Sequence, residues 1–402
     1  MTRPPITGVL LPFLAVYVGA YAAFGVASPF LPSFLSERGL NPSNISVLLA
    51  SGTAIRLLSA PLAAQVADRW RIPRGVLAAS LGASSLVALL YLPATGFLPL
   101  AGVSLLHAAV LAPLTPTADA LALGQREAFD YGWVRGAGSA AFVAGTFVAG
   151  VAMDHFGLAS FLWLNAACLV VATLCVAFLP RSPVEGLTKD SGKPGDLRAL
   201  LANRTFLLTI GVAALILSSH AMHDAFAVLR WRKAGFSNSL VSVLWSEAVI
   251  AEVVMFTLLG PWLLRRWSPA TCAALAAVAG IVRWTIVSQT LSPSLIGLVE
   301  PLHGVTFALL HLAAMRIIAE IVPVDLATSA QAFYGTVAAG ACTALVTLAS
   351  GPLYGRFGGE AFLAMSGLCA LALPLALLLH RAAKPVAGSD AIRENTADAT
   401  NR

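Results

Sequence analysis

The chain alternates between long apolar runs and short polar segments. No charged residue occurs between Arg3 and Glu37 or between Arg74 and Asp119. About twenty consecutive apolar residues cross a bilayer as one helix. The pattern predicts an all-α integral membrane protein with twelve transmembrane helices, at residues 7–33, 44–67, 74–92, 98–123, 131–153, 158–179, 204–228, 239–264, 270–290, 293–320, 328–353 and 361–380. Because eleven spans follow the first, we expect the first to be a retained helix and not a secretory signal.

The composition excludes several classes of protein. Of the 402 residues, 58% are hydrophobic and 11% are charged, whereas an ordinary soluble domain carries about 25% charged residues. We therefore expect no water-soluble enzyme. The net charge of +6 comes from short basic clusters between apolar runs, so nucleic acid is not an expected partner. The five cysteines lie in apolar runs without CxxC spacing, and we expect no disulfide, metal or other cofactor.

The positions of lysine and arginine predict the orientation in the membrane. With both termini inside, seventeen basic residues fall in cytoplasmic segments and five in outside segments. Cytoplasmic segments of membrane proteins carry an excess of lysine and arginine. The count therefore predicts that both termini are cytoplasmic. The outside cluster Arg230, Arg232 and Lys233 is a local exception that the sequence does not explain.

The two halves of the chain repeat one another at a lag of about 200 residues. Residues 68–70 return at 265–267, 105–109 at 301–305, 131–134 at 334–337, and 153–157 at 354–358. Each helix of the first half thus recurs six helices later with the same orientation. This pattern predicts two six-helix bundles, at 1–180 and 204–381, with any substrate site between them near the membrane midplane. Residues 181–203 would form a cytoplasmic linker, and residues 382–402 a disordered cytoplasmic tail.

One loop carries a recognisable signature. Residues 61–74, PLAAQVADRWRIPR, resemble the major facilitator signature between helices two and three, a Gly-xxx-Asp-Arg run followed by basic residues. Asp68 and Arg69 match this run, whereas Ala64 stands in place of the glycine. The resemblance assigns Asp68 and Arg69 to gating or structural ion pairs.

Three further segments point to one branch of this family. Residues 131–142, 251–256 and 302–316 (YGWVRGAGSAAF, AEVVMF and LHGVTFALLHLAAMR) resemble the phenylpropionic acid transporter branch, which is similar to the nucleoside and oligosaccharide proton symporters. The resemblance covers nearly all of residues 7–380. It implies the major facilitator fold in a bacterial inner membrane, and we expect a monomer whose partners are a small-molecule substrate, protons and membrane lipid.

The resemblance also implies a function. It suggests proton-coupled uptake of a small organic solute by alternating access, with an aromatic carboxylate such as a phenylpropionate-like acid as the substrate. An exporter of amphipathic compounds, or an importer of a sugar or nucleoside, is the alternative, because such motifs fix the substrate poorly. A membrane enzyme would need a nucleophile or metal cluster in a loop, and the short outside loops offer only Asp154 and His155.

Charged residues inside the predicted helices are candidates for function. Each costs about 2.5 kcal/mol or more on insertion scales, so each must face a partner or a water-filled cavity. Asp119 and Arg135 lie at matching depth near the cytoplasmic mouth on consecutive helices, which predicts a gating or structural ion pair; substrate contact is the alternative. Glu252 and Arg283 also match in depth and predict a second pair, for which Glu247 is a competitor.

Arg56 lies in the middle of the second predicted helix, with no acidic residue at its level. Its planar guanidinium group suits a carboxylate. We therefore predict that Arg56 binds an anionic substrate, and a structural pairing is the alternative.

In the family that the chain resembles, helices one, four, seven and ten line the cavity. Their polar residues here are Tyr17, Tyr21, His107, His220, His223, Asp224, Glu300, His303 and His311. We predict that substrate is contacted by Tyr17, Tyr21, His107 and His303. Glu300 and Glu252 are the predicted proton carriers, because a buried carboxyl group can exchange its proton near neutral pH. For each histidine a satisfied core position is the alternative.

Overall fold

The computed structural model describes residues 6–180, 197–323 and 326–382. All regular secondary structure within these ranges is helical, which confirms the predicted all-α class. Most of the predicted linker at 181–203, and nearly all of the predicted tail at 382–402, lie outside the described residues.

The first set of helices, α1 to α8, is called the N-terminal group here. It comprises α1 (Ile6–Ala27), α2 (Leu31–Glu37), α3 (Pro42–Trp70), α4 (Pro73–Leu90), α5 (Phe97–Leu111), α6 (Leu114–Leu123), α7 (Tyr131–Phe156) and α8 (Ser160–Val176). Proline begins α3 and α4, at the helix position where its missing N–H is not needed. The Asn41 side chain caps α3 by accepting a hydrogen bond from the Asn44 N–H at 2.8 Å. Pro113 separates α5 from α6.

The remaining helices are called the C-terminal group. The α-helices are α9 (Leu197–Ala202), α10 (Arg204–Ser218), α11 (Ala221–Lys233), α12 (Asn238–Val254), α13 (Gly260–Arg266), α14 (Pro269–Gln289), α15 (Pro293–Val299), α16 (Leu310–Ile321), α17 (Ala327–Phe333), α18 (Cys342–Phe357) and α19 (Phe362–Ala382). Wider π-helical turns, η1 (Met255–Leu259), η2 (Gly304–Leu309) and η4 (Tyr334–Ala341), connect consecutive α-helices, and a short 3₁₀ turn, η5 (Gly358–Ala361), precedes α19. Such turns often occur at functional sites.

Ten helical stretches of the described residues are long and apolar enough to cross a membrane. The predicted helices at 328–353 and 361–380 both fall within one of them, Ala327–Ala382, which has 56 residues. The predicted helix at 158–179 corresponds to a shorter apolar helix, Ser160–Val176. The apolar pattern therefore locates the helical segments, while the structure divides them differently.

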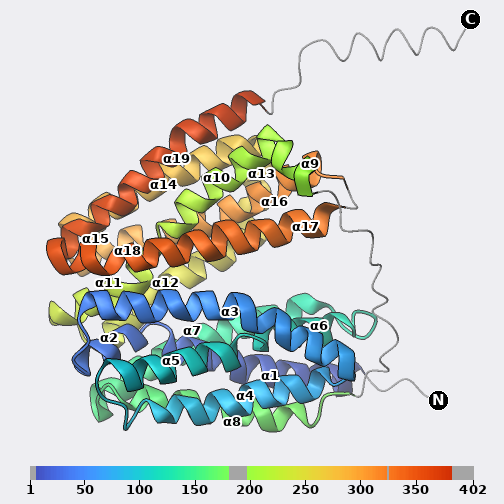
Figure 1. The fold of residues 1–402 in the computed structure, drawn as a ribbon, viewed down its shortest axis with the longest axis vertical. Helices are drawn as coiled ribbons and strands as arrows, with labels where there is room; N and C mark the ends of the chain where they lie inside the picture. The colour runs from blue at the N-terminus through green and yellow to red at the C-terminus, as the bar shows by residue number, and fades with distance from the viewer. Residues whose placement is uncertain (1–5, 181–196, 324–325, 383–402) are drawn as a thin grey trace, which may run out of the picture.

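The two groups lie side by side, with α3 and α7 of the N-terminal group next to α18 and α12 of the C-terminal group (Figure 1). Within the groups, α1 packs against α7 and α8, and α14 packs against α19. Each group has its own hydrophobic core. A third core joins the two groups and includes Phe30, Phe34, Phe226, Trp231 and Phe362.

Polar contacts join the groups at one end, which we call the closed end. The Asp154 carboxylate, at the end of α7, accepts hydrogen bonds from the backbone and side chain of Asn238 at 2.8 Å each, and from the backbone and hydroxyl of Ser239 at 3.0 and 2.5 Å. A Cβ atom on Gly150 would lie 2.6 Å from the Asn238 carbonyl oxygen, so only glycine permits this approach of α7 to α12. The two groups are therefore held in close contact where α7 ends and α12 begins.

The basic cluster that the sequence did not explain lies at this closed end. Arg232 Nη2 is 2.9 Å from Glu37 Oε1, an ion pair between the C-terminal and N-terminal groups. Arg230 donates hydrogen bonds to the carbonyl groups of Val287 and Ser288. Two of the three basic residues thus make structural contacts.

Candidate functional site

A cavity of about 520 Å³ lies between the two groups of helices. Its polar lining includes Arg56 from α3 and, from the C-terminal group, His220, His223, Asp224 and His303. Aromatic rings from both groups also line it, namely Phe142, Trp245 and Phe307. The cavity has a volume typical of sites for small molecules, and apolar walls with a few polar groups are the usual form of such sites.

Arg56 contributes an unpaired cation to this cavity. Its side chain is exposed to the cavity, and within the described residues it has neither an ion pair nor a hydrogen bond. A guanidinium group has five N–H donors and no acceptor. Arg56 can therefore donate to an anionic ligand without first leaving a protein partner.

The C-terminal group contains a buried ion pair beside the cavity. Arg283 Nη2 of α14 lies 2.6 Å from Glu300 Oε2, and both side chains are 0% exposed. Glu300 follows the last residue of α15, and the adjacent Pro301 lacks a backbone N–H, so the α-helical hydrogen bonding is interrupted between α15 and η2. His223 Nε2 is 3.2 Å from the other Glu300 oxygen. Glu300 thus has a partner on each carboxylate oxygen.

Further contacts extend this pair in both directions. Arg283 Nη1 is 3.2 Å from His303 Nδ1, and His303 Nε2 is 3.5 Å from Glu252 Oε2. On the other side, His223 Nδ1 is 3.6 Å from Asp224 Oδ1. These contacts form one continuous series, which we call the polar chain: Asp224, His223, Glu300, Arg283, His303 and Glu252. Its two ends are the more exposed carboxylates, at 58% for Asp224 and 29% for Glu252.

The polar chain differs from the predicted pairing of Glu252 with Arg283. Arg283 contacts Glu300, whereas Glu252 contacts His303. The prediction compared depth along each helix, and depth does not specify which way a side chain points around the helix axis. Glu300, which follows α15, contacts Arg283 of α14, and Arg283 connects Glu300 to His303.

His107 does not line the cavity, unlike the predicted residues Arg56 and His303. Its ring packs edge-to-face on Tyr91, with 5.7 Å between ring centroids, and it is outside the cavity lining. His107 Nε2 is buried and has no hydrogen-bond partner among the described residues. The predicted set of His107, Glu300 and His303 is therefore divided, with only Glu300 and His303 in the polar chain.

The two predicted tyrosines lie with the Asp119–Arg135 pair and not in the cavity lining. Tyr17 donates a hydrogen bond to Asp119 Oδ1 at 2.5 Å, and Arg135 donates to the Tyr21 hydroxyl. Arg135 Nη1 lies 3.9 Å from Asp119 Oδ1. The tyrosine rings stack at 5.8 Å between centroids. We call these four residues the tyrosine cluster.

Asp68 and Arg69 lie in the last turn of α3, outside the cavity lining. Within the described residues no ion pair is found for either side chain. Sequence reasoning did not single out Trp245, which stacks on His223 with 5.2 Å between ring centroids and lines the cavity. A tryptophan two residues before Glu247 was the available signal, but a tryptophan in an apolar helix also suits a lipid-facing surface.

Comparison with known proteins places this architecture in a family. Residues 10–364 match the model of the MFS_1 like family. The chain is 33% identical over 365 residues to a probable 3-phenylpropionic acid transporter of Escherichia coli (strain K12), covering 87% of this chain and 92% of that protein. It is 24% identical over 386 residues to a maltose permease of Geobacillus stearothermophilus, covering 94% and 96%.

A solved structure shows the same fold. The crystal structure of the nucleoside transporter NupG matches with a TM-score of 0.81 and 16% sequence identity, over 94% of this chain and 99% of that one. These matches confirm the resemblance found in the sequence. They also support the prediction that the chain is an integral protein of the bacterial inner membrane. The chain belongs to the MFS_1 like family of membrane transporters.

Proposed function

We propose that this protein imports an aromatic carboxylate together with protons by alternating access. The observation that carries this proposal is Arg56, an unpaired guanidinium group facing a cavity that also has aromatic walls. A desolvated carboxylate gains two parallel hydrogen bonds from such a group. The name of the Escherichia coli relative, a probable 3-phenylpropionic acid transporter, agrees with this chemistry.

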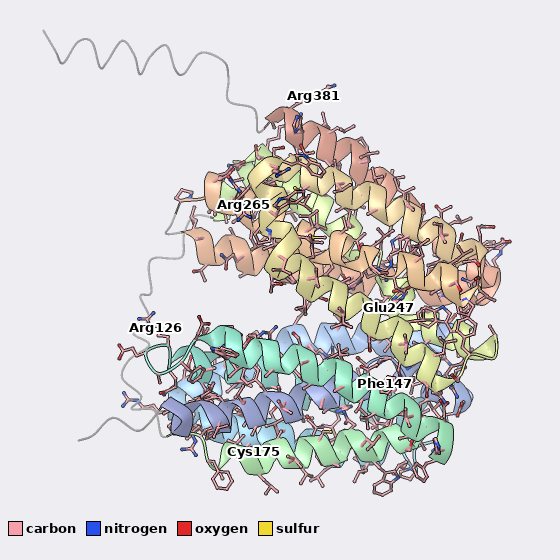
Figure 2. All side chains as sticks on the ribbon, turned by 180° about the vertical axis from the view of Figure 1, so that it is seen from behind. Arg126, Phe147, Cys175, Glu247, Arg265 and Arg381 are labelled. Carbon is pink, nitrogen blue, oxygen red and sulfur yellow. The ribbon has the colours of Figure 1, made fainter. Side chains whose placement is uncertain are left out.

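The proposed topology is twelve transmembrane helices in two bundles, at 1–180 and 204–381, with both termini in the cytoplasm. About twenty residues suffice for one crossing, so the stretch Ala327–Ala382 has room for two. Counting Ser160–Val176 as a further crossing gives twelve. Figure 2 shows Arg126, Arg265 and Arg381, from both groups, toward the same end of the molecule, and we assign that end to the cytoplasm.

Alternating access requires the closed end to open. In the proposed topology this end faces outward, because it is formed where α7 ends and α12 begins. The Asp154 contacts and the Glu37–Arg232 pair are solvent-accessible polar contacts, which can break and re-form in water. We therefore propose that this structure represents the inward-facing state, and that the tyrosine cluster gates the opposite end.

The polar chain supplies candidates for the coupling proton. Glu300 is bound by Arg283, so a proton on Glu300 would break an ion pair between two fully buried groups. Glu252 contacts only His303 in the polar chain, and its side chain is partly exposed. We propose Glu252 as the proton carrier in this state, and Glu300 as a carrier only if a conformational change separates it from Arg283.

The experiment is uptake of 3-phenylpropionate into proteoliposomes under an imposed pH gradient, acidic outside. Wild type should accumulate the acid, and Arg56→Lys should raise KM about tenfold, since an ammonium group cannot reproduce the planar fork. Arg126→Lys is the matched control, because Arg126 is exposed outside the cavity. Equal KM for wild type and Arg56→Lys would exclude the anion site.

Two further measurements test coupling and substrate class. Glu252→Gln should abolish accumulation against a gradient but retain counterflow exchange, which needs no net proton movement. Intact accumulation in this variant would exclude Glu252 as the carrier. Maltose and a nucleoside serve as competing solutes, and preferential uptake of either, or export of the acid, would contradict the proposed direction and substrate.

A further inference from the structure

The cavity carries a second exposed charge, which the proposed carboxylate site leaves unused. Asp224 lies in the first turn of α11, in the C-terminal group, and its side chain is 58% exposed. Arg56 lies on α3, in the other group, and also lines the cavity. No ion pair joins Arg56 to Asp224 within the described residues. The cavity thus has a free cation on one wall and an accessible carboxylate on the other.

Asp224 is placed by its helical backbone and by one neighbouring side chain. Its backbone N–H donates to the His220 carbonyl at 2.9 Å, and its Oδ1 is 3.6 Å from His223 Nδ1. His223 is itself fixed by Glu300 and by stacking on Trp245. In the described part of the chain, no protein donor contacts Asp224 Oδ2. This oxygen is therefore an available hydrogen-bond acceptor on the cavity wall.

We propose that Asp224 binds a hydroxyl group on the ring of the substrate, so that the preferred solute is a hydroxylated aromatic carboxylate. This inference rests on the proposed function, because it assumes that Arg56 holds the carboxylate. A substrate that reaches both walls then places the far end of its ring beside Asp224. Trp245 and Phe307, which line the same cavity, supply apolar surface for the ring. A phenolic hydroxyl donates one hydrogen bond and matches the free oxygen.

The chemistry favours a hydroxyl group over an ammonium group. An α-amino acid carries its ammonium next to its carboxylate, and so cannot place the two groups on opposite walls. A cation at the far end of the ring would share this side of the cavity with the buried cation Arg283, which contacts the cavity-lining His303. A neutral hydroxyl group avoids repulsion from Arg283 and still donates a hydrogen bond to the Asp224 carboxylate.

The test is competition with radiolabelled 3-phenylpropionate for the purified protein. The competitors are 3-(4-hydroxyphenyl)propionate, its 4-methoxy analogue, which accepts but does not donate, and the 4-aminomethyl analogue, which is a cation. Wild type should bind the hydroxy acid about tenfold more tightly than the methoxy acid, as expected for a hydrogen bond to a charged acceptor. Asp224→Ala should reduce this ratio to about one, and Asp224→Asn, which keeps an oxygen acceptor, should give an intermediate ratio.

The ratio separates recognition from a merely structural role, since loss of helix stability would weaken both analogues equally. Equal binding of the hydroxy and methoxy acids by wild type, with normal binding of 3-phenylpropionate, would overturn only the role of Asp224. The role of Asp224 would also be overturned if Asp224→Ala and Asp224→Asn kept the wild-type ratio of hydroxy-acid to methoxy-acid binding. Tighter binding of the aminomethyl analogue than of the hydroxy acid would overturn it too. Failure of every aromatic acid to bind would overturn the proposed function and this inference together.

Discussion

The two groups of helices share a sequence repeat but use charge differently. In the N-terminal group, Arg56 stands alone at the cavity and the other intramembrane charges are held by tyrosines. In the C-terminal group, six polar side chains form one continuous chain around a fully buried ion pair. The comparison indicates that two groups with a common sequence repeat and a common helical scaffold can carry quite different arrangements of charged side chains.

One pair of repeat-related residues shows this divergence directly. His107 and His303 occupy corresponding positions in the two halves. His107 packs on Tyr91 and leaves Nε2 without a partner among the described residues. His303 connects Arg283 to Glu252. The same residue type is thus a core side chain in one group and part of the polar chain in the other.

The largest expected effect concerns stability. Glu300→Gln would leave Arg283 as an uncompensated buried charge, which costs about 3–5 kcal/mol. Asp119→Asn in the N-terminal group should cost much less, because Asp119 and Arg135 are 26% and 42% exposed. The measurement is thermal unfolding of both variants in detergent. Equal losses would contradict the proposed difference between the groups, and partial recovery in the double variant Glu300→Gln/Arg283→Gln would support it.

The sequence predicts the scaffold better than the site. Apolar runs predict the helices because lipid excludes charge over a fixed length. Depth along the membrane normal predicts the proximity of Asp119 and Arg135, which lie 3.9 Å apart. It does not predict that Arg283 contacts Glu300, because that contact depends on the direction of each side chain around its helix.

The repeat-related histidines provide the second test. Phenylalanine preserves ring packing at both positions, because His107 packs on Tyr91 and His303 stacks on Phe307 at 5.5 Å. His303→Phe should destabilise the protein by about 1–3 kcal/mol, since it removes the contacts of buried charged partners. His107→Phe should be neutral or slightly stabilising, because it removes an unsatisfied buried nitrogen. The two measurements are the free energy of unfolding and proton-driven accumulation. If the two substitutions had equal effects on both, the proposed difference between the two histidines would be contradicted.

The third test asks whether the groups move as separate bodies. Asp154→Ala removes a cap that reaches from α7 to the start of α12, at a cost of about 1–2 kcal/mol. Asp130→Ala is the control, because Asp130 caps α7 within its own group by accepting a hydrogen bond from Gly132 N–H at 2.6 Å. Spin labels at the exposed Phe156 and Lys233, in a background without the native cysteines, should show longer distances only in Asp154→Ala. Unchanged distances would indicate that Asp154 does not hold the closed end together.

The smallest expected effect lies in the tyrosine cluster. Because Asp119 and Arg135 are partly exposed and 3.9 Å apart, their coupling energy should not exceed about 1 kcal/mol. A double-mutant cycle with Asp119→Asn and Arg135→Gln measures this energy from unfolding, and uptake is measured for the same variants.

If the pair gates the cytoplasmic end, each single variant should reduce uptake more than the double variant, because a single change leaves one charge unpaired. A double variant as poor as the worse single variant would show that the two residues act separately, and Tyr17→Phe would then test whether the hydrogen bond to Asp119 is the contact that matters.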